Sequence, residues 1–261
     1  MAESDRLYKC CDAFTSERHD DVLLLRFVEK PFIFTLDMGA KNRFVECLQS
    51  VALDDRVKSV VLFGRSEKAG ASEFVEFFEK ALLPEADQKI MHKMLNIFNQ
   101  FMLTVLDLDK FVVSAEFGPL VSQFFYAGLV CDYRIMAEGS VVQNAFLRAD
   151  MPPKGGGPFF LPHMVSRRVA YELLTDTGDI TAEKLHSLGL VDEIVPAADM
   201  EQAALRAAHR FAAVPGNSLA GIKKFMNYEL RRQLSRYLEF ENQEVLKAYN
   251  AARLRLARSK K

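Results

Sequence analysis

Cysteine is scarce in this chain, and its four cysteines form neither a metal-ligand pattern nor a disulfide framework. Cys10 and Cys11 are adjacent, which is a poor geometry for a bridge between them, and Cys47 and Cys131 stand far apart. No metal site is therefore predicted. A chain with free thiols and no disulfide framework is expected in a reducing compartment, so we predict a cytoplasmic protein.

Long apolar runs and an excess of one charge are also absent. No run of 18 apolar residues occurs, and the first 21 residues are mixed and acidic, so neither a membrane span nor a signal sequence is predicted. The net charge of −1 gives no reason to expect nucleic acid as a partner. After Glu244 the chain is nevertheless basic throughout, which is typical of a solvated helix end or of a phosphate contact.

The hydrophobic pattern alternates between strands and helices. Val22 to Val28 and Val57 to Phe63 are apolar runs typical of buried strands, whereas Ala40 to Val51 has its apolar residues at helical spacing. Glu73 to Leu106 is largely helical, with a break at Pro84. Strands that alternate with helices predict an α/β core, here residues 1–197, followed by a helical segment over residues 198–261.

Helix boundaries are predicted most clearly in the second half of the chain. Thr181 is expected to cap a helix that ends at Gly189, a typical C-terminal glycine position. Asp199, with Gln202 three residues later, resembles a capping box for the next helix. From Ser218 onward the pattern is helical to the end, and its apolar residues need a partner surface.

The stretch from Lys110 to Leu161 carries the most specific pattern. A strand-like run, Phe111 to Phe117, meets a Gly118-Pro119 turn and a helical run, and a second strand then begins after Cys131-Asp132. This order resembles the centre of the crotonase (enoyl-CoA hydratase/isomerase) superfamily, whose usual wording is close to PVIAAVNGxxxGGGxELxxxCD.

Three further blocks carry the same resemblance. Val57 to Gly64 resembles the strand vraVVLtG, and Lys68 to Phe78 (KAGASEFVEFF) takes the place of the loop FxAGADlxEm. Ile180 to Pro196 (ITAEKLHSLGLVDEIVP) is similar to IsAxeAxxxGLVxxVvp. The resemblance implies a ββα spiral core with a C-terminal helical oligomerisation segment, a homotrimer or dimer of trimers, and an acyl-thioester substrate.

The resemblance also implies an oxyanion hole, in which two backbone N–H groups stabilise the enolate of the thioester. One donor belongs to the AGAD loop, which we match to Glu73, and the other is the middle glycine of GGG, which matches Gln123. Ser122, Gln123 and Phe124 place side chains where the family has three glycines that allow close approach of the ligand. The sequence therefore predicts an altered oxyanion hole.

Both acid–base positions of the hydratases are changed. Hydration needs a base for water and an acid for the α-carbon, which two glutamates supply in the family. The first glutamate matches Tyr126 and the second matches Phe146, which cannot transfer a proton. Tyr126 is either an acid or a packed core residue. The pattern therefore argues against a standard enoyl-CoA hydratase.

Other polar residues near these positions are candidates for the chemistry. Lys154, in PPKGGGPF, and Asp150 are the candidate catalytic residues besides Tyr126, although an exposed loop lysine is the plainer interpretation of Lys154. Glu116 interrupts an apolar strand, so it is either a buried acid with a shifted pKa or the partner of Arg134. The glycines after Lys154 do not form GxxxxGK[ST], so no nucleotide triphosphate site is predicted.

Recognition of the thioester carrier is expected from basic and loop residues. The family's LNRP motif is replaced here, and Lys30 is the available cation in its place. Lys68, Ala69 and Ala71 in the AGAD-like loop, and Lys247 in the tail, complete the predicted acyl-CoA site. No separate cofactor is predicted, because CoA or phosphopantetheine would arrive as part of the substrate, on acyl-CoA or on an acyl-carrier protein.

Two hypotheses from different classes follow from these residues. The first is a divergent enzyme that acts on an acyl thioester through enolate stabilisation, by decarboxylation, isomerisation or hydrolysis. The second is a catalytically silent subunit with a binding or assembly role, because Gln123, Phe124 and Phe146 would fill the site. An open pocket lined by Tyr126, Lys154 and Asp150 favours the first, and a pocket filled by phenylalanine favours the second.

Overall fold

The structure is a computed structural model that describes residues 14–27, 38–64, 70–83, 86–87 and 89–259. Within these residues a six-stranded sheet has the order β1-β2-β3-β4-β6-β9. Only the β1–β2 pair is antiparallel, and the other neighbours are parallel. The strands are β1 Phe14–His19, β2 Val22–Phe27, β3 Ser59–Phe63, β4 Phe111–Glu116, β6 Tyr133–Ala137 and β9 Glu193–Val195.

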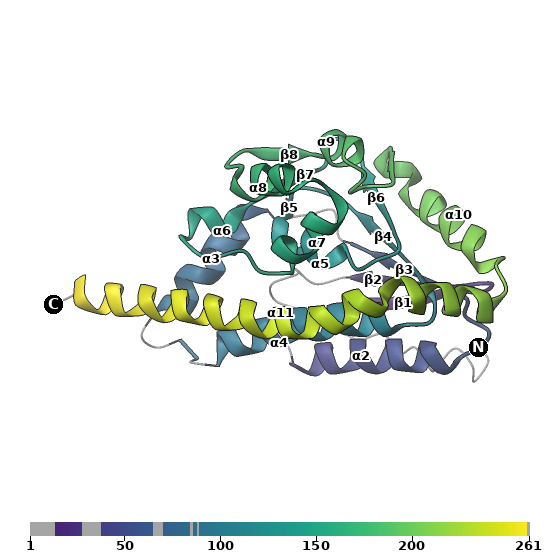
Figure 1. Ribbon diagram of the computed structural model, residues 1–261, viewed down its shortest axis with the longest axis horizontal. Helices are drawn as coiled ribbons and strands as arrows, with labels where there is room; N and C mark the ends of the chain where they lie inside the picture. The colour runs from purple at the N-terminus through teal and green to yellow at the C-terminus, as the bar shows by residue number, and fades with distance from the viewer. Residues whose placement is uncertain (1–13, 28–37, 65–69, 84–85, 88, 260–261) are drawn as a thin grey trace.

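The parallel strands are continuous apolar runs because both faces of the sheet are covered. Helix α10 (Met200–Ala212) covers one face, and its alanines allow it to lie close to the strands. The opposite face is covered by the helices in the middle of the chain (Figure 1). Side chains alternate between the two faces along each strand, so that Val113 and Ala115 pack under α10 while Val112 faces the other core.

A second sheet of three short strands stands beside the first, in the order β5-β7-β8. These strands are β5 Leu120–Val121, β7 Val141–Gln143 and β8 Asp179–Thr181. Strands of two or three residues show no clear periodicity, and sequence analysis did not predict them. The pairing of Val121 with Gln143 places the start of the helix after β5 next to the end of β7.

The predicted helices are present, with small changes at their ends. The helical stretch expected from Glu73 to Leu106 is two helices, which end at Leu82 and begin again at Ile90, and Pro84 lies outside the described residues. The helices are α2 Met38–Leu53, α3 Ala71–Leu82, α4 Ile90–Asp107, α5 Ser122–Gly128, α6 Ala145–Arg148, α7 Gly157–Met164, α8 Arg167–Thr175 and α9 Ala182–Ser187, with a 3₁₀ turn at Ala197–Asp199.

One of the two predicted helix caps is confirmed. Thr181 Oγ1 accepts a hydrogen bond from the Lys184 amide at 3.2 Å, and Gly189 beyond the helix has φ of +72°. The capping box at Asp199 was wrong, because Asp199 has helical φ and ψ, and its side chain makes no capping bond. A 3₁₀ turn precedes the helix here and removes the extended backbone that a capping side chain requires.

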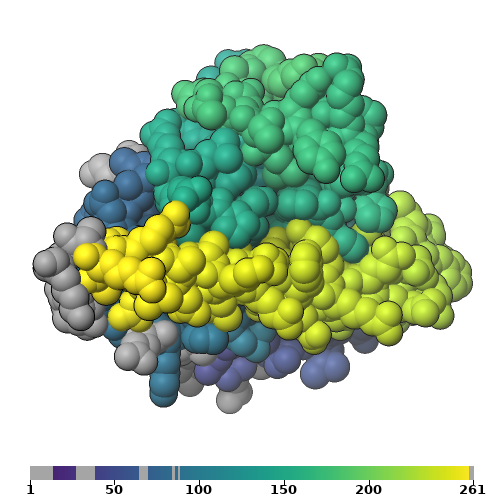
Figure 2. Space-filling model, turned by 60° about the vertical axis from the view of Figure 1, so that its left-hand side comes forward, coloured from purple at the N-terminus to yellow at the C-terminus, as the bar shows by residue number. Residues whose placement is uncertain are grey.

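The C-terminal segment is one long helix, α11 (Gly216–Ser259), which crosses the molecule beside α4 (Figure 1). Its length follows from the absence of proline after Pro215. Figure 2 shows α11 along the surface, with the teal central segments above it. Its buried face contacts the core, and the division of the chain after residue 197 stays a prediction. No helix within the described residues is long and apolar enough to cross a membrane.

Candidate active site

Tyr126 is a core residue in this structure, with 1% of its surface exposed. Its hydroxyl donates a hydrogen bond to Asn144 Oδ1 at 3.1 Å. The Asn144 amide group in turn donates to the carbonyl oxygens of Leu173 and Asp176. Burial raises the pKa of Tyr126, and the charge of Asp176 adds to this effect. The hydroxyl is thus held in a closed network, and its raised pKa opposes ionisation.

Phe125 packs against the ring of Tyr126, with 5.9 Å between the ring centroids. Phe125 and Phe146 are buried in the core, and the Phe146 side chain has no group that transfers a proton. Phe124 is half-buried and packs against the ring of Phe98, with 5.2 Å between the ring centroids. Tyr126 and Phe146, which the sequence predicts at the two acid–base positions, are therefore both core residues.

Lys154 is buried, and it is not the exposed loop lysine of the plainer interpretation. Its Nζ donates to Glu241 Oε2 at 2.6 Å and to Asn99 Oδ1 at 2.7 Å. Burial lowers the pKa of Lys154, while the charge of Glu241 acts in the opposite direction. Glu241 also accepts from the Gly156 amide, through Oε1, at 2.8 Å. Lys154 thus joins α11 to the turn before α7.

Glu241 was not predicted from the sequence, although its spacing on α11 indicates a buried position. Leu234, Leu238, Val245 and Tyr249 are the buried residues around it on α11, at intervals of three and four. Glu241 lies on the same face, so the stripe contains one acidic residue. An acid within an apolar stripe indicates a buried partner of opposite charge.

Asp150 is at the surface, whereas Tyr126 and Lys154 are buried. It is an exposed residue after α6 with φ of +49°, and it forms a salt bridge with Arg255 at 3.3 Å. Both side chains of this pair are well exposed, so the bridge stabilises little. Asp150, Lys154 and Tyr126 line neither of the two cavities described below, and their joint role in catalysis stays a prediction.

The start of α3 holds the AGAD-like segment. The Glu73 amide, our expected oxyanion donor, donates to the Gly70 carbonyl oxygen at 3.0 Å and is therefore already used within the first turn. The Ala71 amide points to the second sheet instead and donates to Gln143 Oε1 at 2.8 Å. Gln143 Nε2 donates to Asp179 Oδ1 at 2.8 Å, which fixes the orientation of this side chain.

The start of α5 has donors and acceptors without partners. No acceptor for the Gln123 amide is found among the described residues, since it lies in the first turn of the helix. Ser122 Oγ and Gln123 Oε1 are also buried without a hydrogen-bond partner there. Buried polar groups in native proteins are normally paired, and exceptions are found at functional sites. An oxygen atom of a ligand at this place would accept hydrogen bonds from the Ser122 hydroxyl and the Gln123 amide.

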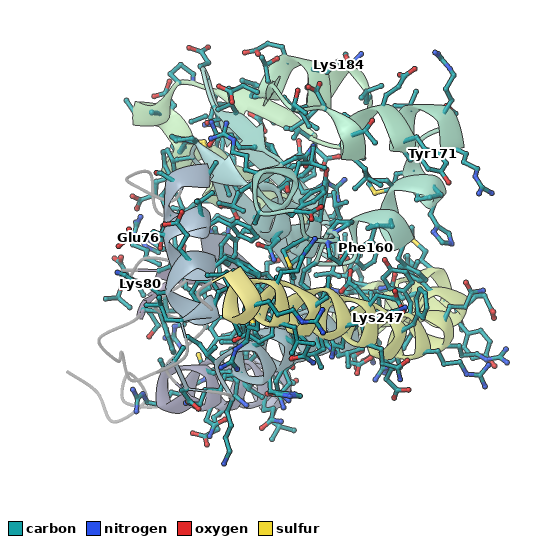
Figure 3. The ribbon with its side chains drawn as sticks, turned by 90° about the vertical axis from the view of Figure 1, so that its left-hand side faces the viewer. Glu76, Lys80, Phe160, Tyr171, Lys184 and Lys247 are labelled. Carbon is teal, nitrogen blue, oxygen red and sulfur yellow. The ribbon has the colours of Figure 1, made fainter. Side chains whose placement is uncertain are left out.

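The predicted carrier-binding residues are only partly described. Lys30, Lys68 and Ala69 lie outside the described residues. Ala71 is buried at the start of α3. Lys247 is exposed on α11, and its Nζ lies 3.8 Å from Glu244 Oε2. Glu76 and Lys80 are on the neighbouring helix α3 (Figure 3). Lys247 is therefore available to a ligand or partner at the surface.

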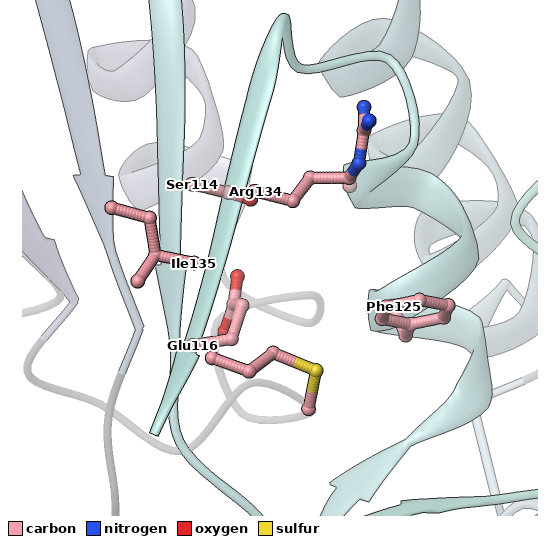
Figure 4. Close-up of a pocket in the computed structure, with 7 residues that line it drawn as sticks. Ser114, Glu116, Phe125, Arg134 and Ile135 are labelled. Atoms are coloured by element: carbon pink, nitrogen blue, oxygen red, sulfur yellow. The ribbon is translucent and has the colours of Figure 1, made fainter. Parts of the chain in front are cut away.

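Glu116 ends strand β4 at the carboxyl edge of the parallel sheet. Its carboxyl group lies against Gly64, where an added Cβ would be 2.2 Å from Glu116 Oε2. A small cavity beneath it is lined by residues of β4, β6 and α5, including Phe125 and Arg134 (Figure 4). Arg134 pairs with Asp192 at 3.0 Å, so the expected Glu116–Arg134 pair does not form.

Burial without a charged partner raises the pKa of Glu116 to about 8. Its carboxyl group is therefore protonated at neutral pH and can donate a hydrogen bond or a proton. A second cavity, between α8 and β8, is lined mainly by acidic and apolar residues and includes Asp179. Within the described residues no group of three or more His, Cys, Asp or Glu side chains could hold a metal ion.

Known proteins similar to this chain share both its sequence pattern and its fold. The family model described as enoyl-CoA hydratase/isomerase matches residues 18–258. The bacillaene synthase decarboxylase PksI of Bacillus subtilis is 29% identical over 136 residues, which are 52% of this chain and 55% of that protein. The 4-chlorobenzoyl coenzyme A dehalogenase-2 of Arthrobacter sp is 23% identical over 249 residues, which are 94% of this chain and 90% of that protein.

Solved structures show the same architecture at low sequence identity. An enoyl-CoA hydratase from Bacillus halodurans superposes with a TM-score of 0.80 at 18% identity, covering 94% of this chain and 99% of the other. An enoyl-CoA hydratase from Polaromonas sp. JS666 has a TM-score of 0.70 at 25% identity, covering 88% and 91%. Since the family model matches almost the whole chain, this protein belongs to the enoyl-CoA hydratase/isomerase family, the crotonase superfamily.

Proposed function

We propose that this protein acts on an acyl thioester through an enolate, by decarboxylation and not by hydration of a double bond. The observation that carries the proposal is the start of α5, where the Gln123 amide and the Ser122 hydroxyl have no acceptor among the described residues. Preorganised donors at such a position stabilise an oxygen atom on which negative charge develops. A thioester carbonyl oxygen that becomes an enolate is such an atom.

Hydration is disfavoured by what stands at the two acid–base positions. Addition of water needs one group to activate the water and another to protonate the α-carbon. Phe146 has no titratable group, and the Tyr126 hydroxyl is already bonded to Asn144. Neither position can take up a proton from water at neutral pH.

Decarboxylation avoids this requirement. The bond to the leaving carboxylate breaks, at the α-carbon of a malonyl thioester or at the γ-carbon of a glutaconyl thioester, its electron pair forms the enolate or the conjugated dienolate, and CO₂ leaves. One proton then adds to the carbon, so the reaction needs an acid and no base. The similarity to a polyketide-associated decarboxylase supports this choice among the enolate reactions.

We propose CoA or phosphopantetheine as the carrier of the acyl group, with no separate cofactor. Lys247, exposed on α11, and Lys30, Lys68 and Ala69 are the proposed carrier contacts, with Ala71 at the base of the loop. A homotrimer or a dimer of trimers is the proposed assembly. Light scattering of the purified protein tests the assembly by its mass relative to the 29.6 kDa chain.

The test of function is turnover of a matched pair of thioesters. Malonyl-CoA and glutaconyl-CoA, each labelled with ¹³C at the leaving carboxyl, are expected to release labelled CO₂ with the enzyme, whereas crotonyl-CoA is expected to lose no absorbance. The same acyl groups on a phosphopantetheinylated carrier protein decide between the two carriers. Crotonyl-CoA hydration at the rate of an ordinary hydratase would overturn the proposal.

A second candidate is a catalytically silent subunit, which the packing around Tyr126 and Phe146 favours. In that case the protein would bind the thioester or carrier protein without turnover. Calorimetric titration of the same substrates separates the two functions. Binding with no labelled CO₂ at any pH between 6 and 9 supports the silent subunit.

A further inference from the structure

The turn between Lys154 and α7 presses directly on α5. Gly155 has φ of +95°, and an added Cβ there would lie 2.4 Å from the carbonyl oxygen of Gln123. An added Cβ at Gly157 would lie 2.5 Å from the ring of Tyr126. Because no side chain separates the turn from α5, a shift of the turn moves the backbone of Gln123.

Glu241 on α11 determines where this turn lies. One oxygen of its carboxylate accepts from the buried Lys154 ammonium at 2.6 Å, and the other accepts from the Gly156 amide at 2.8 Å. Asn99 on α4 accepts from the same ammonium at 2.7 Å. The contacts therefore fix the turn in two directions, from α11 and from α4.

A buried ion pair often stabilises a protein no more than apolar residues of similar volume, because both charges lose their hydration. An apolar pair, however, does not fix an N–H group in direction. The Gly156 amide needs an acceptor at residue 241 to stay in its place. The same bond keeps the neighbouring Gly155 against the backbone of Gln123. The geometry of Glu241 thus suits positioning more than stability.

We propose that Glu241 is a positioning residue, which sets the Gln123 amide for the thioester oxygen through the Gly155–Gly156 turn. This inference rests on the proposed function, because it assigns that amide to the substrate carbonyl. Glu241 does not contact the substrate. It acts from α11, so the C-terminal helix takes part in the site of its own chain.

The test compares two double variants that both remove the buried charges. Lys154→Met with Glu241→Gln keeps a carbonyl acceptor for the Gly156 amide, and Lys154→Met with Glu241→Met removes it. Two CoA ligands are titrated against each: acetonyl-CoA, a ketone that carries a carbonyl oxygen, and S-propyl-CoA, the thioether of the same chain length that lacks it. We expect the Met/Met variant to bind the ketone about tenfold more weakly than the Met/Gln variant, with equal affinity for the thioether.

A purely structural role of Glu241 predicts another result. Both ligands would then weaken together, or neither would change, and either outcome overturns the proposal. Hydrogen exchange without ligand tests the position of α5 independently: amides of residues 122–128 should exchange faster in the Met/Met variant than in the Met/Gln variant. If the unmodified protein binds neither ligand while exchange differs, the proposed function fails and the positioning role holds. Equal exchange in the two variants overturns the positioning role.

Discussion

Glu116 is a residue whose charge state depends on the fold. Its pKa rises from 4.5 to about 8 in the folded protein because burial disfavours the carboxylate. Between these two values the unfolded chain has an ionised Glu116 and the folded chain a protonated one. The unfolded state therefore binds fewer protons, and the contribution of Glu116 to stability decreases as the pH rises from about 4.5 to about 8.

Glu116→Gln removes this dependence. We expect the variant and the unmodified protein to unfold at similar urea concentrations at pH 4.5, and the variant to be more stable by about 2 kcal/mol at pH 9, after allowance for the partial exposure of the side chain. Urea titrations across pH 4.5–9, followed by circular dichroism, measure the difference. A constant difference between the two proteins at every pH would mean that Glu116 does not titrate in this range.

Tyr126 provides a second test at this scale. Tyr126→Phe leaves Asn144 Oδ1 without its donor in a buried site, and we expect a loss of about 1–2 kcal/mol in the free energy of unfolding. Turnover of the labelled thioesters should change less than twofold. The control is Tyr171→Phe on α8, whose side chain is exposed and should tolerate the change. A loss of turnover above a hundredfold with unchanged stability would identify Tyr126 as the acid.

Residue identity was predicted better than residue environment. Both glutamates are predicted to be absent, because the sequence matches Tyr126 and Phe146 to their positions, and this match stays a prediction. The partners of the polar residues do not follow from it. Lys154 and Glu241 are 87 positions apart, and no local pattern relates them. Such pairs depend on how α11 crosses the core, which periodicity does not specify.

At the scale of elements, the short helix α5 is in close contact with Gly155 of the neighbouring turn, whereas Gly128 at the end of α5 has free space around it. Gly155→Ala places a Cβ 2.4 Å from a carbonyl oxygen at a residue with φ of +95°, so we expect a loss of about 3 kcal/mol or more. Gly128→Ala at the end of α5 is the matched control, because an added Cβ there meets no atom within 4 Å. Alanine suits a helix better than glycine, so this control should gain about 0.5 kcal/mol.

Urea unfolding of both variants decides the point. Equal stability of Gly155→Ala and the unmodified protein would mean that the turn does not press on α5. The comparison also tests the basis of the positioning role of Glu241, because that role needs direct contact between the turn and Gln123.

Most long elements were predicted, and the short ones were not; the exception is β1 (Phe14–His19), which is as long as β2 and was not predicted because its exposed residues give no apolar run. The runs that became β2, β3 and β4 have enough apolar residues to be recognised without a partner. The strands β5, β7 and β8 have two or three residues each and exist only because they pair with one another. The cap at Thr181 was predicted because its contacts are local, whereas the three-residue 3₁₀ turn before α10 was not predicted.

For the whole molecule, the question is whether α11 is an attachment or part of the core. The sequence predicted an apolar helical segment that needs a partner surface, and the structure places that surface on the same chain. Leu238, which is 1% exposed, packs in the main core, and the Tyr249 hydroxyl donates to the Ala81 carbonyl oxygen at 2.6 Å. Because these contacts lie within the core, α11 and the rest of the chain stabilise each other.

We therefore expect the chain to unfold as one unit. Leu238→Ala removes a buried side chain and should lower the free energy of unfolding by about 3 kcal/mol, without dividing the transition into two steps. Phe225→Ala on the same helix is the control, because Phe225 is 84% exposed and its loss should cost less than about 0.5 kcal/mol. Far-ultraviolet circular dichroism reports the helices, and near-ultraviolet signals of the tyrosines report the core. If the two signals separate in Leu238→Ala, with helix lost first, α11 is an independent segment and its carboxylate at residue 241 has no fixed relation to α5.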